Sequence, residues 1–148
     1  MKKEEIINDL IEINHDRIEG YARAADEARD EDLRSLFSNM ASQSKRFAGE
    51  LEPYADKQGE ESAKGTTFKG KIYRIWMDVK AAFTGHDRKS ILASCEFGED
   101  AAQKAYNAAL DHPSEIAGDL RLTIENQKKS LRESHDRIKH LRDANPAS

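Results

Sequence analysis

Four long stretches of the chain carry apolar side chains at alternating three- and four-residue spacings, the pattern of a helix with one buried face. In the first stretch this stripe consists of Ile7, Ile11, Asn14, Ile18, Tyr21, Ala25 and Ala28. The alternating pattern of a half-buried strand does not occur, and the strand-favouring residue valine is present once, at Val79. The sequence therefore predicts an all-α protein.

The breaks between the stripes indicate where the helices begin and end. We predict bundle helices at about 3–29, 31–57, 88–111 and 114–142, and a shorter helix at about 67–84. Asp30, Asp87 and Ser114 stand where three of these helices would begin, and their side-chain oxygens suit the N-cap position. Pro53 falls late in the second stripe, so it should kink that helix or end its regular part.

The connections between the four long helices differ in length. The first and the last are short turns, whereas the middle one runs from residue 58 to residue 87. A four-helix bundle with one long crossover between its second and third helices has the ferritin-like arrangement. The helix predicted at 67–84 would be this crossover, with Trp76 as its apolar anchor. We expect one four-helix-bundle domain over residues 1–148.

Five segments of the chain resemble a known family. They are residues 8–13 (NDLIEI), 20–21 (GY), 72–82 (IYRIWMDVKAA), 98–106 (GEDAAQKAY) and 134–138 (SHDRI). On these segments the chain resembles an uncharacterised bacterial family of ferritin-like four-helix-bundle proteins, a domain of unknown function. The resemblance implies the ferritin-like fold, and similarity to ferritin-like bacterial proteins implies a link to stress physiology. It implies no particular activity.

A polar residue interrupts each of the four stripes near its middle. The interrupting residues are Asn14, Ser44, Glu99 and Ser134. Glu99 needs a partner most, because an isolated buried carboxylate is very unfavourable. We expect hydrogen bonds from the other three residues, or from Tyr21, to hold its carboxylate. Together these residues would form a core polar layer that fixes the register of the helices.

A metal centre at the same level of the bundle is the alternative. Ferritin-like di-iron sites take a Glu from each of two helices and a Glu-x-x-His pair from each of the other two. The Glu-x-x-His pattern occurs nowhere in this sequence, and Glu99 is the one metal-ligand type among the four mid-stripe residues. A ferroxidase of the usual kind is therefore disfavoured, and we expect no catalytic residues.

A smaller metal site is a further possibility. Residues 15–18 (HDRI) of the first helix are repeated as residues 135–138 (HDRI) of the last, so two histidines flank their stripes at equivalent positions. A mononuclear iron or manganese site could form there. Its candidate ligands are Glu99, His135, His15 and Asp16, with Glu19 and Glu96 as further carboxylates. Alternatively, both histidines lie at the edge of the core, and the charges near them form surface ion pairs.

Composition narrows the classes of function. The net charge of -4 and the pI near 5.8 disfavour nucleic-acid binding, which usually needs a basic surface. Apolar runs are too short for a membrane span or a secretory signal, and one cysteine allows no internal disulfide. We therefore expect a cytoplasmic, non-enzymatic protein without a cofactor that self-associates or binds another protein. The alternative is a metal-binding or redox protein with a degenerate site centred on Glu99.

Overall fold

The structure is a computed structural model that describes residues 2–55 and 88–144. These residues form four long helices, α1 (Lys3–Glu27), α2 (Glu31–Leu51), α4 (Arg88–Leu110) and α5 (Gly118–Asp143), and a short 3-10 helix, η1 (Glu52–Tyr54). No strand occurs in these two ranges, so the all-α prediction is confirmed for them. The helix predicted at 67–84, which includes Trp76, lies outside the described residues.

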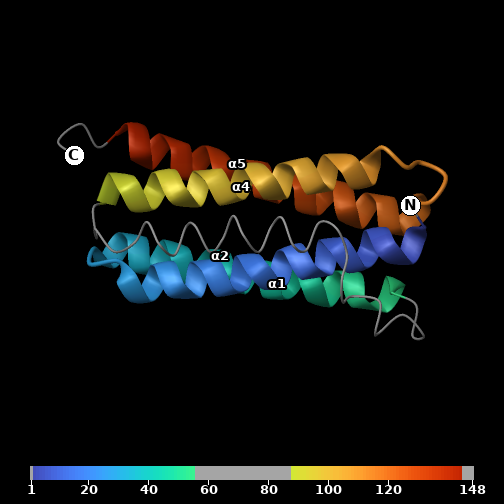
Figure 1. Cartoon of the computed structure of the whole chain (residues 1–148), viewed down its shortest axis with the longest axis horizontal. Helices are drawn as coiled ribbons and strands as arrows, with labels where there is room; N and C mark the ends of the chain where they lie inside the picture. Colours follow the sequence, from blue (N-terminus) through green and yellow to red (C-terminus); the bar gives the residue numbers. More distant parts are fainter. Residues whose placement is uncertain (1, 56–87, 145–148) are drawn as a thin grey trace.

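The four helices pack as two antiparallel hairpins. α1 packs along α2 and α4 packs along α5, and the hairpins meet through α1 with α4 and α2 with α5 (Figure 1). The described part of the chain is thus a four-helix bundle. α2 and α4 run in the same direction, and η1 lies at the opposite end of the bundle from the start of α4 (Figure 1). These helix directions are the ones that a long crossover between α2 and α4 requires.

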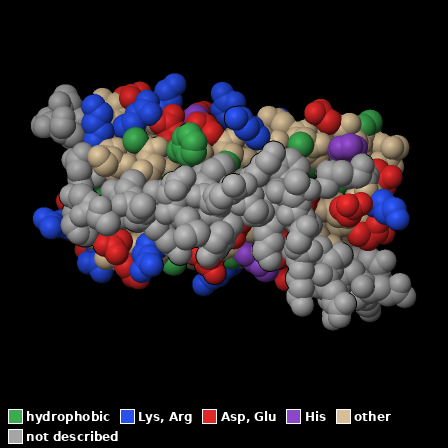
Figure 2. Space-filling view, in the orientation of Figure 1, with side chains coloured by type: hydrophobic (Ala, Val, Ile, Leu, Met, Phe, Trp, Pro, Cys, Tyr) green, Lys and Arg blue, Asp and Glu red, His purple; other side chains and the backbone are tan. Residues whose placement is uncertain are grey.

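The apolar stripes of the four helices meet in a continuous core. Its largest fully buried apolar side chains include Ile7, Leu10, Phe37, Leu51, Leu92 and Tyr106. The opposite faces of the helices carry charged side chains of both signs, which Figure 2 shows interspersed over the described part of one face. No helix among the described residues is both long enough and apolar enough to cross a membrane.

The last helix begins later than the sequence predicts. It starts at Gly118, whereas Ser114 was the expected N-cap and is exposed in the turn before it. The backbone N–H of Ile116 donates to the carbonyl of His112 at 2.8 Å, and the Ile116 side chain is fully buried. The Ile116 side chain thus packs at the end of the core, and the helix begins two residues later. Gly118 then takes a φ of 63°, a conformation that favours glycine.

The other described boundaries follow the prediction closely. α1 ends at Glu27, because Ala28 adopts extended backbone with its side chain buried in the core. Asp30 occupies the N-cap position of α2, but its Oδ2 accepts a hydrogen bond from Arg88 at 2.8 Å instead of capping the helix. The regular part of α2 ends at Leu51, and Pro53 lies in η1, as predicted.

Candidate functional site

The centre of the bundle contains a buried ion pair between α1 and α4. Nε of Arg17 donates to Oε1 of Glu99 at 2.7 Å, and Nη2 of Arg17 donates to Oε2 at 2.8 Å. Both side chains have an exposed fraction of 0%. The two parallel hydrogen bonds use both carboxylate oxygens, the geometry of the strongest arginine–carboxylate pairs. Glu99 is therefore held by a cation and is not exposed to any solvent-filled space.

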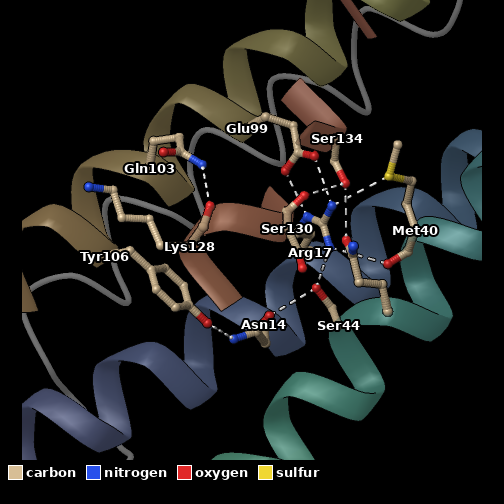
Figure 3. A network of polar contacts seen from close by, with 11 residues as sticks. Asn14, Arg17, Met40, Ser44, Glu99, Gln103, Tyr106, Lys128, Ser130 and Ser134 are labelled. Atoms are coloured by element: carbon tan, nitrogen blue, oxygen red, sulfur yellow. Dashed lines mark hydrogen bonds and ion pairs between the residues drawn. The ribbon is translucent and has the colours of Figure 1, made fainter. Parts of the chain in front are cut away.

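The remaining donor group of Arg17 connects the ion pair to α2. Its Nη1 donates to Oγ of Ser44 at 2.7 Å and to the backbone carbonyl of Met40 at 3.3 Å. The Ser44 hydroxyl in turn donates to Oδ1 of Asn14 on α1 at 2.9 Å. Figure 3 shows these side chains converging from α1, α2 and α4. The ion pair is thus one end of a longer polar network.

Asn14 continues the network toward α4 and α5. Its Nδ2 donates to the hydroxyl of Tyr106 at 2.9 Å, and that hydroxyl donates to Oε1 of Gln127 at 2.6 Å. Nε2 of Gln127 donates to Oε1 of Glu50 on α2 at 2.9 Å. An unbroken series of hydrogen bonds and one ion pair therefore connects all four helices through the core.

The predicted polar layer is present in part and is organised differently. Asn14, Ser44 and Glu99 belong to the network, but Arg17 joins them. Ser134 is buried on α5, where its hydroxyl lies 3.1 Å from the carbonyl of Ser130 and 3.3 Å from Oε1 of Gln43. Gln127, two turns earlier on α5, is the residue through which that helix joins the network, because its Oε1 accepts from the Tyr106 hydroxyl.

Tyr21 contributes through its ring. The guanidinium carbon of Arg17 lies 5.0 Å from the centroid of the Tyr21 ring, within the range of a cation–π contact. The same ring packs against Phe37 of α2 with a centroid separation of 5.7 Å. The apolar part of the core thus contacts the buried cation directly.

Burial and charge keep the titratable groups of the core in one protonation state. Burial lowers the pKa of Arg17, but attraction to Glu99 outweighs this effect and the pKa is raised. Burial, together with the Glu99 charge, raises the pKa of the Cys95 thiol well above its ordinary value. Burial likewise raises the pKa of Tyr106. These groups remain a guanidinium, a thiol and a phenol at neutral pH, so Cys95 has the character of a core residue and not of a nucleophile.

The metal ligands proposed from the sequence do not come together in the described residues. Glu99 is bound by Arg17, His15 is exposed on α1, and Asp16 is buried on α1. Among the described residues, the one group of three potential ligands whose atoms lie within 4.8 Å of one another is Glu96, Asp100 and His135. His135 therefore lies near two carboxylates that could bind a metal with it. They belong to Glu96 and Asp100, which flank Glu99 on α4, and not to Glu99 itself.

This second group lies on the outer side of the α4–α5 hairpin. Nε2 of His135 lies 2.7 Å from Oδ1 of Asp100 and 3.5 Å from Oε2 of Glu96. Its Nδ1 lies 3.1 Å from Oδ1 of Asp136, and the His135 contact lowers the pKa of that carboxyl. Arg142 donates to the other oxygen of Glu96. The histidine is thus surrounded by three carboxylates.

A polar groove of about 270 Å³ lies between α2 and α5. Met40 and Ser134, which border the core network, contribute to its lining, together with charged Glu133 and Arg137. Ligand pockets are mostly apolar with a few convergent polar groups. The groove lacks that character, so we do not assign a small-molecule site to it.

Two residues of the core network could have been recognised from the sequence. Steps of three and four residues from Asn14 reach Arg17 and then Tyr21, so Arg17 lies on a helical stripe together with them. Gln127 interrupts the stripe of the last helix. Arg17 and Glu99 carry opposite charges on the stripes of two different helices, and this complementarity is the sequence feature that predicts their pairing.

The fold and the site define a class: an all-α four-helix bundle whose core is crossed by an arginine–glutamate network. Residues 2–112 match the family described as "Domain of unknown function (DUF2383)", and the chain belongs to that family. A search of curated proteins found no match. The matched residues include Arg17 and Glu99, whereas His135 lies beyond them.

Proposed function

We propose that this protein is a non-enzymatic, ferritin-like bundle in which the Arg17–Glu99 ion pair occupies the position that a metal centre takes in catalytic bundles of this type. The ferritin-like assignment is supported by the helix order, the parallel directions of α2 and α4, and the long connection between them. The observation that carries the proposal is the engagement of both Glu99 oxygens by one guanidinium.

The chemistry of this pair disfavours iron at the centre of the bundle. A di-iron site needs several carboxylates with free oxygens, and two histidines beside them. Here the mid-bundle carboxylate is neutralised by a fixed cation, which would repel a second positive charge. The polar contacts of the pair are the hydroxyl of Ser44 and the carbonyl and sulfur atoms of Met40. These contacts suit an arginine, and none of them is one of the further carboxylates or histidines that a di-iron site needs.

A bundle with such a core can act through its surface. We propose that it self-associates or binds another protein in the cytoplasm, in a role connected with stress physiology. The acidic net charge and the mixed surface charges support a protein partner over nucleic acid. The polar network would serve this role by holding the four helices in one register.

Two measurements on the purified full chain test this proposal. Light scattering over a concentration series should give a mass that is a multiple of 16.7 kDa, or chemical crosslinking in cells should trap a defined heterocomplex. Fe(II) added in air should oxidise no faster than in buffer. Oxidation that is catalysed by the wild type and by a His135→Ala variant, but not by a variant lacking Arg17 and Glu99, would contradict the proposal.

A further inference from the structure

We propose that the surface seam between α4 and α5 holds a divalent transition-metal ion, with Glu96, Asp100 and His135 as its ligands. This site is separate from the Arg17–Glu99 network and does not depend on it. It also differs from the ligand set expected from the sequence: Glu99 is absent, Glu96 was a further candidate there, and Asp100 is new.

Two packed helices position the three side chains. Glu96 and Asp100 are four residues apart on α4, so their side chains share one face of that helix. His135 approaches them from α5, which packs along α4. The side chains of His135 and Glu96 are 15% and 12% exposed, whereas that of Asp100 is 54% exposed. The group is therefore partly removed from water on one side and open to it on the other.

The separations of the ligand atoms suit a common metal ion. Metal–nitrogen and metal–oxygen bonds of about 2.0–2.2 Å place tetrahedral ligand atoms about 3.4 Å apart, and octahedral neighbours about 3 Å apart. Nε2 of His135 lies 2.7 Å from Oδ1 of Asp100 and 3.5 Å from Oε2 of Glu96. All three ligand atoms lie within 4.8 Å of one another, and the exposed side chain of Asp100 has room to adjust its position around an ion.

The ring of His135 is held by a contact of Nδ1, the nitrogen that would not bind the metal. Nδ1 lies 3.1 Å from Oδ1 of Asp136, so the tautomer with its proton on Nδ1 donates to that carboxylate. In this tautomer, which the bound ion would select, the lone pair of Nε2 is directed toward Glu96 and Asp100. A carboxylate that accepts from the distal nitrogen of a ligand histidine is the usual outer partner at metal sites, where it fixes the ring and its tautomer.

The charge balance at the seam favours a cation. With His135 neutral, the seam carries four carboxylates, those of Glu96, Asp100, Asp136 and Asp143, and two guanidiniums. Arg142 pairs with Glu96 and Asp143, and Arg132 pairs with Asp136. Arg142 donates to Oε1 of Glu96, so Oε2 is the oxygen left on the side of His135. A divalent ion would balance the remaining two negative charges.

The mixture of one imidazole and two carboxylates selects the kind of metal. Mg²⁺ and Ca²⁺ prefer oxygen ligands alone, whereas Zn²⁺, Fe²⁺ and Mn²⁺ accept both imidazole and carboxylate. Affinity at such sites rises from Mn²⁺ through Fe²⁺ to Zn²⁺. A bound ion would connect α4 to α5 across their seam and would keep at least one coordination position open to water.

Calorimetric titration of the tag-free, chelator-treated full chain with Zn²⁺ tests the site. We expect one equivalent to bind, with Mg²⁺ unable to compete at similar concentration. His135→Ala should weaken binding at least tenfold, and Asp136→Asn should weaken it about tenfold through the ring orientation. His15→Ala is the matched control, because it removes an exposed histidine of the same HDRI motif and should leave binding unchanged.

Circular dichroism spectra establish whether each variant is folded, and Asp100→Asn supplies a second ligand variant at an exposed position. The proposal is overturned if wild-type protein binds no Zn²⁺. It is also overturned if folded His135→Ala and Asp100→Asn variants bind as tightly as the wild type. Equal binding of Mg²⁺ and Zn²⁺ would likewise contradict it, because that result would indicate attraction to acidic side chains without a histidine ligand.

Discussion

The buried arginine is stable because each of its donor groups has an acceptor. Arg17 presents five N–H bonds, and its contacts are the two oxygens of Glu99, the Ser44 hydroxyl, and the carbonyl and sulfur atoms of Met40. A lysine could not replace it, because an ammonium group lacks the planar fork that binds both carboxylate oxygens at once. Glu99 and Arg17 are therefore a matched pair, and neither residue alone suits this core.

Tyr106→Phe tests the second half of the network. The substitution keeps the ring but removes the hydroxyl, so Gln127 Oε1 loses its donor and Asn14 Nδ2 loses one of its two acceptors. We expect the free energy of unfolding in urea to fall by about 1–3 kcal/mol. Tyr54→Phe in η1 is the control, because Tyr54 is only half-buried. This substitution should lower the free energy of unfolding much less. Equal effects of the two substitutions would show that the Tyr106 hydroxyl is not a significant partner.

At the scale of the element, the apolar stripes determine where the helices lie. Particular residues determine where each helix begins and ends. The prediction of α1, α2 and α4 was accurate to within a few residues, apart from the last turn of the second helix, where Pro53 ends the regular part. The start of α5 was missed because Ser114 is a suitable N-cap in isolation. Burial of Ile116 decides the outcome, and burial depends on the whole bundle.

Gly118→Ala tests that helix start. A Cβ at this position would meet no atom within 4 Å, so the effect comes from the backbone, whose φ of 63° is unfavourable for alanine. We expect a loss of about 1 kcal/mol in the free energy of unfolding. Gly49→Ala in α2 is the matched control, because Gly49 is equally open but has helical backbone. This substitution should raise the free energy of unfolding by about 0.5–1 kcal/mol. Effects of the same sign would contradict the assigned backbone conformation of Gly118.

At the scale of the whole molecule, two ion-pair sites among residues 2–55 and 88–144 join the hairpins in different surroundings. Arg17 and Glu99 connect α1 to α4 in the core. Arg88, at the start of α4, pairs with Asp30 and Asp32 at the start of α2, but its side chain is 27% exposed. Solvent screens the second site, so its contribution should be small even though its distances are similar.

Arg88→Met tests this difference. We expect a loss of less than about 1 kcal/mol in the free energy of unfolding, and less in high salt. The hydrogen bond from Arg88 lowers the pKa of Asp32 below 3.8, so this contribution is present at neutral pH and disappears as the pH falls through the lowered pKa. Denaturation curves at pH 7 and at pH 3 check the sign. A larger difference between wild type and variant at pH 3 would contradict the assignment.

The sequence predicted the helices and the buried Glu99 better than it predicted the partners of Glu99. A stripe identifies which face of a helix is buried, but Arg17 and Ile18 stand side by side at its edge, and an arginine in such a place is usually exposed. In the structure Ile18 is half-buried and Arg17 is fully buried. The sequence alone also does not determine the offset between helices, and that offset places Gln127 instead of Ser134 in the network.

Arg17 and Glu99 form one structural unit at the centre of the bundle. A double-mutant cycle in urea with Arg17→Met, Glu99→Met and the combined variant tests it most directly. Each single substitution leaves a buried charge without its partner and should cost about 3–5 kcal/mol in the free energy of unfolding. The combined variant removes both charges and should be much closer to wild type than the sum of the two losses. Losses that simply add would contradict the pairing, and a Glu99→Met variant as stable as wild type would show that Arg17 does not depend on its carboxylate.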